Sequence, residues 1–172
     1  FVVLLQARWD GKAGGAWYNY TFGSRGLGTP ETLERIGKER GFRVLVVPPV
    51  LYEGEPVSST RVREAVERGD VALAGALLGR MYSLSGRIIR NKRIGRRIGF
   101  PTANIEPEER RVLPPDGVYA TIAYVRGAAY RAVTNIGTNP TIEDGKLGIE
   151  THLLDFDADI YGEVLTVAFH SF

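Results

Sequence analysis

From Tyr82 onward, the chain alternates short runs rich in β-branched and aromatic residues with turns that contain glycine and proline. Runs of this composition are typical of β-strands. The sequence predicts strands over residues 82–89, 117–124, 130–136, 148–156 and 164–169. The turn-like connections allow successive strands to pair antiparallel, and closure into a small barrel would leave no sheet edge exposed.

The first half of the chain mixes helical and strand patterns. Thr29-Pro30-Glu31 combines a capping hydroxyl, a first-turn proline and an acidic first turn, which predicts a helix that Gly41 ends. A strand over residues 42–47 should follow this helix. Residues 1–5 are expected to form a buried strand, because they are apolar but too few to span a bilayer.

Two further helices are expected before the β-rich half. Ser58-Ser59-Thr60 is a capping sequence for a helix over residues 61–68. Gly69-Asp70 should end that helix and start another that runs to about Leu78. We therefore expect an α/β portion over residues 1–79 and a β-barrel domain over residues 80–172.

The composition fits a globular protein of one domain or two small ones, with 172 residues of which 44% are hydrophobic. The formal net charge is only +2, but positive charge gathers in one window, at Arg87, Arg90, Lys92, Arg93, Arg96 and Arg97. A local field of this kind favours phosphate binding. The absence of cysteine excludes disulfides and thiolate metal sites, and it fits a cytoplasmic location.

The segment that follows this basic window has the residues of a phosphate and cation site. Gly95 and Gly99 allow close approach of the backbone, and Thr102 and Asn104 place neutral oxygens on alternate residues of an extended strand. This combination indicates ATP and a divalent cation. In the alternative interpretation, Thr102 and Asn104 satisfy local backbone groups and the basic residues form a solvated hairpin tip.

Four segments in order carry a resemblance to a known family: GRIIRNKRIGRRIGFPTANI, LPPDGVYA, NIGTNPT and ETHLLDFDADIYGE. They resemble riboflavin kinase, in the form that is fused to a flavin adenylyltransferase in bacterial bifunctional FAD synthetases. The resemblance covers roughly residues 80 to 172. It implies a six-stranded antiparallel Greek-key barrel that phosphorylates riboflavin to FMN with ATP and Mg²⁺. It implies no nucleic-acid partner and no membrane, and it leaves the oligomeric state open.

The resemblance also implies roles for individual residues. Thr102 and Asn104 would bind Mg²⁺ together with the phosphates, and Glu150 would be the catalytic base that accepts the proton of the riboflavin hydroxyl. ATP would be bound by Asn91, Gly95, Arg96, Arg97, Gly99 and Thr102. Asn91 departs from the family, which commonly has glycine there. No flavin-contacting residue is assigned.

Period-two alternation in residues 149–154 places Glu150 and His152 on the same face of the expected strand. An exposed strand glutamate is the alternative for Glu150, and a hydrogen-bonded structural role is expected for His152. The acidic cluster Asp155, Asp157, Asp159 and Glu163 lacks the glycine that a calcium loop needs, so we expect a polar hairpin turn. The segment 135–141 is either a loop near the active site or a simple turn.

Residues 16–80 are similar to the later part of the flavin adenylyltransferase domain. Ser58, Ser59, Thr60 and Arg63 would form its phosphate site, with a plain helix N-cap as the alternative. The His-x-Gly-His signature of that domain is absent from this sequence, so FAD synthesis by this chain alone is not expected. The chain is also expected to stop short of a family helix that helps to close the flavin pocket.

Two other functions are compatible with the same residues. A small β-barrel could bind nucleic acid with its arginines while Tyr82, Tyr119, Tyr124 or Tyr130 stack on bases. The domain could also be an inactive remnant that binds flavin or ATP without catalysis.

Overall fold

The structure is a computed structural model that describes residues 13–89, 102–107, 111–138 and 147–172. The chain forms two compact units, Phe1–Val57 and Ser58–Phe172. The predicted domain boundary between residues 79 and 80 lies where the resemblance to one family domain ends and the resemblance to the other begins, and it stays a prediction. In the part of the chain that the structure describes, no helix is both long and apolar enough to cross a membrane.

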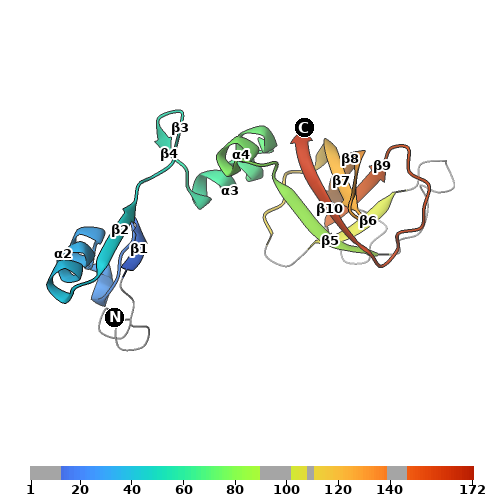
Figure 1. Cartoon of the computed structure of the whole chain (residues 1–172). Coiled ribbons are helices and arrows are strands. Elements are labelled where there is room, and N and C mark those ends of the chain that lie inside the picture. Colours follow the sequence, from blue (N-terminus) through green and yellow to red (C-terminus); the bar gives the residue numbers. More distant parts are fainter. Residues whose placement is uncertain (1–12, 90–101, 108–110, 139–146) are drawn as a thin grey trace. The chain divides into compact units, whose positions relative to one another are not determined.

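The first unit is built on a strand, a helix and a second strand. Strand β1 (Ala13–Trp17) pairs parallel with β2 (Arg43–Val47), and helix α2 (Pro30–Arg40) lies between them in the sequence (Figure 1). A short 3₁₀ helix η1 (Ser24–Gly26) precedes α2, and the hairpin β3 (Leu51–Tyr52) and β4 (Glu55–Pro56) follows β2. This arrangement confirms the predicted helix-to-strand α/β unit.

Helix α2 begins and ends where its capping residues predict. The Thr29 hydroxyl accepts a hydrogen bond from the Thr32 amide, and Gly41 adopts the left-handed conformation, with φ of 77°, that ends the helix. Leu33 of α2 packs with Ala16 of β1 in a small core. The predicted strand at residues 1–5 lies outside the described residues.

The second unit opens with two helices, α3 (Ser59–Glu67) and α4 (Val71–Leu78). Their caps are Ser58, which accepts from the Arg61 amide, and Asp70, which accepts from the Leu73 amide. Because Ser58 itself is the cap, α3 begins two residues before the predicted start at residue 61. Both helices belong to the same compact unit as the β-rich half.

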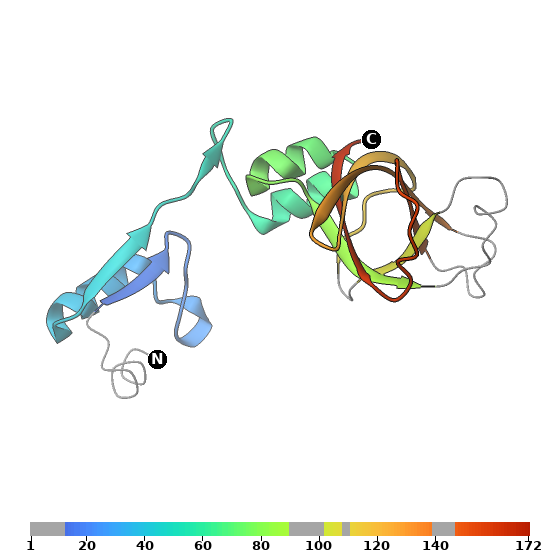
Figure 2. The same ribbon diagram turned by 45° about the vertical axis from the view of Figure 1, so that its right-hand side comes forward.

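The rest of the second unit is a closed antiparallel barrel, seen as a ring in Figure 2. Its strands are β5 (Ser83–Ile89), β6 (Ala103–Pro107), β7 (Gly117–Val125), β8 (Ala128–Thr138), β9 (Leu147–Leu153) and β10 (Val164–Ser171). Their order around the barrel is β10-β5-β6-β9-β8-β7. The six-stranded antiparallel barrel that the resemblance implied is therefore confirmed, and the sequence located five of the strands to within a few residues.

The barrel interior is filled by alternate residues of each strand. Tyr119, Phe169, Leu84, Ile136 and Ile149 are among its largest side chains, and each is almost fully buried. A chain of hydroxyls also crosses the interior, because Thr134 hydrogen-bonds to Thr121 at 2.9 Å and to Thr151 at 3.0 Å. The outward positions between these residues carry the polar side chains of the site.

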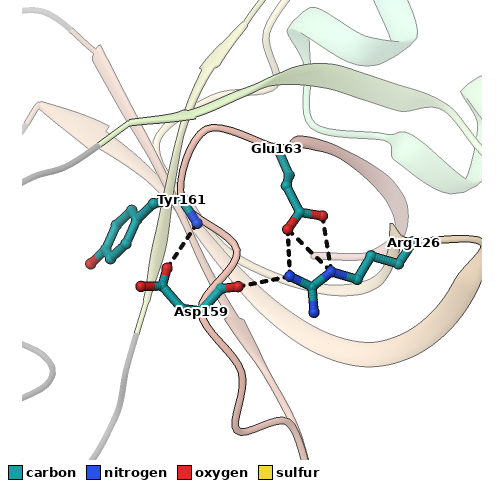
Figure 3. Close-up of polar contacts among 4 residues, drawn as sticks. All are labelled: Arg126, Asp159, Tyr161 and Glu163. Atoms are coloured by element: carbon teal, nitrogen blue, oxygen red, sulfur yellow. Dashed lines mark hydrogen bonds and ion pairs between the residues drawn. The ribbon is translucent and has the colours of Figure 1, made fainter.

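The guanidinium group of Arg126, in the turn between β7 and β8, hydrogen-bonds to the connection between β9 and β10. Nε and Nη2 of Arg126 donate to the Glu163 carboxylate, and Nη2 also donates to the Asp159 carbonyl at 2.8 Å (Figure 3). The bond to Glu163 raises the pKa of Arg126 above its usual range. The Asp159 carboxylate accepts a hydrogen bond from the Tyr161 amide. The acidic residues therefore lie in a polar connection, but the predicted hairpin is wrong, because β9 and β10 are not neighbours in the barrel.

Candidate functional site

Three polar side chains stand in one row across neighbouring strands of the barrel. Asn104 on β6 is the register partner of Glu150 on β9, and Glu150 is in turn the partner of Asn135 on β8. Directly opposed residues of antiparallel strands point to the same face, with their Cβ atoms about 4.5–5.5 Å apart. The carboxylate of Glu150 therefore has a carboxamide on each side.

The row lies on the outer face of the barrel. The residues on either side of Glu150, Ile149 and Thr151, are buried in the interior, so period-two alternation turns Glu150 outward. Thr134 and Ile136 are also buried in the interior, so Asn135 between them points outward. Asn104 also points outward but is only 9% exposed, whereas Glu150 is half-buried and Asn135 is exposed.

The structure brings together two of the three residues that the resemblance placed at the centre of the chemistry. Asn104 and Glu150 are direct partners. Thr102 lies one residue before β6 and is half-buried, and continuing the register by one step places its backbone opposite His152. The roles of Thr102 and Asn104 as metal ligands, and of Glu150 as a base, stay predictions.

The other predicted site residues divide into two groups. Asn91, Gly95, Arg96, Arg97 and Gly99, predicted to bind ATP, lie outside the described residues. Ser58, Ser59, Thr60 and Arg63 lie at the start of α3 and are exposed. Ser58 acts there as the N-cap, with its Oγ 3.2 Å from the Arg61 amide nitrogen, and the phosphate site stays a prediction.

His152 follows Glu150 on the same outward face and is half-buried. It lines an open hollow at the end of β9 together with Arg131, Leu153, Leu154, Asp155, Phe156 and Asp157. Arg131 and Asp155 form an exposed ion pair there at 3.5 Å. Among the described residues, no group of three or more histidine, aspartate and glutamate side chains could hold a metal ion.

The tyrosines proposed as stacking platforms for bases are mostly committed to the fold. Tyr119 has no exposed surface and donates to the Pro115 carbonyl at 2.7 Å. Tyr82 donates to the Val112 carbonyl, and Tyr130 packs edge-on against Phe156 with ring centroids 4.9 Å apart. Tyr124 on β7 keeps 42% of its surface exposed. One exposed ring does not make a platform for successive bases.

Asn135 is the residue of the row that sequence reasoning did not single out. The motif NIGTNPT shows a strand that runs into a turn, but it does not say which strand lies beside Asn135. That information is in the pairing of β8 with β9, which joins residues 15 positions apart in the sequence, Asn135 and Glu150.

Comparison with known proteins shows the family to which the chain is related. The family model for riboflavin kinase (Flavokinase) matches residues 78–172. The bifunctional riboflavin kinase/FMN adenylyltransferase of Pseudomonas fluorescens is 40% identical over 153 residues, which is 88% of this chain and 49% of that protein. The protein of the same name from Bacillus subtilis (strain 168) is 35% identical over 159 residues, which is 90% of this chain and 50% of that protein.

A crystal structure described as a macrolide-efflux protein from Streptococcus pneumoniae has the same fold. Its TM-score is 0.80 at 38% sequence identity, and the match covers 91% of this chain and 50% of that one. The chain thus spans about half the length of the relatives it matches.

Proposed function

Because the chain belongs to the riboflavin kinase family, we propose that it transfers the γ-phosphoryl group of ATP to the 5′-hydroxyl of riboflavin, giving FMN and ADP. The observation that carries this proposal is the direct opposition of Asn104 and Glu150. Phosphoryl transfer requires an anionic triphosphate and an activated hydroxyl to be held together, with the reacting oxygens in line. The neutral amide of Asn104 can serve the triphosphate and its cation, and the carboxylate of Glu150 beside it can activate the hydroxyl.

Thr102 and Asn104 are the residues that would hold Mg²⁺, which offsets phosphate charge when it is bound. They suit this cation because both offer neutral oxygen atoms, the ligand type that it prefers. Asn104 is held by its burial, at 9% exposure, between Ala103 and Ile105, whose side chains are in the core. Such a ligand keeps its orientation without the entropy cost of ordering a free side chain.

Glu150 is the proposed general base. Its carboxylate accepts the proton of the riboflavin 5′-hydroxyl as the hydroxyl oxygen forms a bond to the γ-phosphorus, and the bond from that phosphorus to the β,γ-bridging oxygen breaks to release ADP. Help of this kind typically contributes about 10²–10⁴-fold to the rate. The half-buried position of Glu150 keeps it within reach of a substrate while its strand neighbours fix the backbone.

The remaining ligands are those that the family resemblance implies. We propose that Asn91, Gly95, Arg96, Arg97 and Gly99 bind the ATP phosphates, because glycines allow close backbone approach and arginines pair with phosphate oxygens. The proposed small-molecule partners are therefore ATP, Mg²⁺ and riboflavin. The cytoplasm, where these substrates meet, is the proposed site of action.

The test is a pair of glutamate variants in the whole chain. Glu150→Gln keeps the shape of the side chain and removes the base, so kcat for FMN formation should fall about 10²–10⁴-fold while ADP binding stays close to that of the wild type. Glu106→Gln is the matched control, since Glu106 is an exposed residue on the same outward face of β6. Chromatography of FMN measures the rate. Full turnover by Glu150→Gln would refute the assignment.

A further inference from the structure

We infer that Asn135, Asp116 and the open space above Gly137 form the subsite for the hydroxyl groups of the acceptor's polyol chain. The inference rests on the proposed function and adds residues to its acceptor side. It concerns how the substrate is held and selected, while Glu150 keeps the role of base.

The first observation is the convergence of two polar atoms over a glycine. The position that a Cβ atom would occupy on Gly137 lies 3.9 Å from Nδ2 of Asn135 and 4.0 Å from Oδ2 of Asp116. Two side chains that are distant in the sequence thus lie beside one position that no described atom occupies. Asp116 arrives there because β7 and β8 pair Gly117 with Ile136, and one further step along this register places Asp116 opposite Gly137.

The second observation is that Gly137 is not required by its backbone conformation. Its φ lies outside the positive region that L-residues rarely adopt, in contrast to Gly127 in the β7–β8 turn at the other end of β8, where φ is 76°. Glycine at position 137 therefore provides space instead of conformational freedom. An added methyl group would meet no described atom closer than ordinary van der Waals contact.

The third observation is the distance to the proposed base. Glu150 is the partner of Asn135, and Gly148 is the partner of Gly137, so Glu150 lies diagonally across from Gly137. Diagonal neighbours on adjacent strands are about 7–8 Å apart. A short polyol chain spans such a distance, so its terminal hydroxyl can reach Glu150 while inner hydroxyls lie between Asn135 and Asp116.

The chemistry of the two side chains suits a polyol. A carboxylate accepts hydrogen bonds from hydroxyl groups, and a carboxamide both donates and accepts, so together they can satisfy neighbouring hydroxyls in both senses. Two carboxylates, Asp116 and Glu150, also flank the space, and like charges disfavour an anionic acceptor. The subsite therefore selects a neutral alcohol over a molecule that already carries a phosphate there.

The experiment is a fluorescence titration of the whole chain with two flavins, in the presence of Mg-ADP. Riboflavin carries the polyol chain, whereas lumiflavin has the same ring system with a methyl group in its place. In Asn135→Ala and Asp116→Asn, the Kd for riboflavin should rise about 5–20-fold, the effect of losing one or two hydrogen bonds. The Kd for lumiflavin should equal that of the wild type.

Gly137→Val fills the space and should raise the riboflavin Kd at least as much. The control is Val133→Thr, an outward residue of β8 on the other side of Asn135, which should leave both constants unchanged. Steady-state rates in the Asn135 variant should show a higher KM for riboflavin and an unchanged KM for ATP. A thermal melt of each variant identifies any that fails to fold, and Asp116→Asn is chosen because it preserves shape.

The outcomes distinguish failure of the subsite from failure of the proposed function. If the wild type forms FMN but the variants bind riboflavin as tightly as it does, the subsite is refuted and the proposed function stands. If riboflavin and lumiflavin lose affinity equally, the residues contact the ring and the subsite is again refuted. If the folded wild type neither binds nor phosphorylates riboflavin, the proposed function fails and the subsite fails with it.

Discussion

Thr134 has no exposed surface, and its single hydroxyl joins three strands of the barrel. It hydrogen-bonds to Thr121 on β7 and to Thr151 on β9. These bonds favour one register, because a slip of β9 by one residue would turn Thr151 outward and Glu150 into the apolar interior. The buried hydroxyls thus help to keep the carboxylate beside Asn104 and Asn135.

Removing that one hydroxyl should destabilise the barrel. Thr134→Val keeps the side-chain shape but leaves Thr121 and Thr151 buried without this partner, at a cost of about 1–3 kcal/mol for each orphaned hydroxyl. The free energy of unfolding in urea measures the effect, and Thr134→Ser, which retains the hydroxyl, is the control. Replacing all three threonines by valine should recover much of the loss. Wild-type stability in Thr134→Val would show that the hydroxyls do not hold the register.

At the residue scale, the sequence predicted which way a side chain points better than it predicted which residues lie next to that side chain. Alternation correctly placed Glu150 and His152 on one face, because that pattern is local to one strand. The partners of Glu150 depend on which strands lie beside β9, which is a property of the closed barrel. The sequence therefore placed Asn135 at the end of a strand, in a segment that was either a loop near the active site or a simple turn, without showing that it lies beside Glu150.

At the scale of elements, strand β6 depends on a close approach to β5. A Cβ atom on Gly86 of β5 would lie 2.0 Å from the Glu106 carbonyl oxygen and 2.6 Å from a methyl carbon of Ile105. Real Cβ atoms do not come so close to a backbone atom, so only glycine allows the two strands to pair here. The same strand β6 carries Asn104, so this contact also positions the proposed metal ligand.

Gly86→Ala should therefore impair both folding and function. Overpacking of this kind typically costs about 1–3 kcal/mol, and here the obstruction is backbone, which cannot move aside as a flexible side chain would. We expect a lower melting temperature and loss of FMN formation. Gly14→Ala in the first unit is the matched control, because no atom of the described residues lies within 4 Å of the added atom. Equal melting temperatures for the two variants would contradict this account of β6.

Elements with strong local signals were predicted well, and those without them were missed. Helix α2 has its cap, its proline and its terminal glycine in the sequence, and it forms where they predict. Strand β1 was not predicted, because its sequence AGGAW has two glycines and little β propensity. It forms through parallel pairing with β2, which has the β-rich sequence RVLVV. Tertiary pairing here overrides weak local preference.

At the scale of the whole molecule, buried tyrosines contribute to the packing of the second unit, and their hydroxyl groups resist ionisation. Tyr82 packs against both the helical core and the barrel core, and Tyr119 is fully buried in the barrel. Burial raises the pKa of Tyr82, partly opposed by the charge of Arg111. Burial, followed by the charge of Asp116, raises the pKa of Tyr119. Each hydroxyl is also a hydrogen-bond donor to a carbonyl, a role that the ionised form loses.

The unit should therefore lose stability in alkali. In the unfolded chain, tyrosines ionise near pH 10, whereas the folded state keeps Tyr82 and Tyr119 protonated above that pH. The unfolded state then binds fewer protons than the folded state, so the free energy of unfolding should be fully retained below about pH 10 and should fall as the pH rises further. Urea unfolding at a series of pH values measures this. Tyr119→Phe should show a shallower decline, and an equally steep decline would exclude Tyr119 as a cause.

The central claim is that one row of side chains on the barrel joins the metal-nucleotide site to the base. Paramagnetic broadening of backbone amide signals by Mn²⁺-ADP, with Mg²⁺-ADP as the diamagnetic reference, tests it most directly. The signals of Asn104 and Glu150 should disappear. The signal of Ala128, at the other end of β8 and about 23 Å along the strand from Asn135, should persist. Sharp signals from Asn104 and Glu150 in the Mn²⁺-ADP complex would contradict the claim.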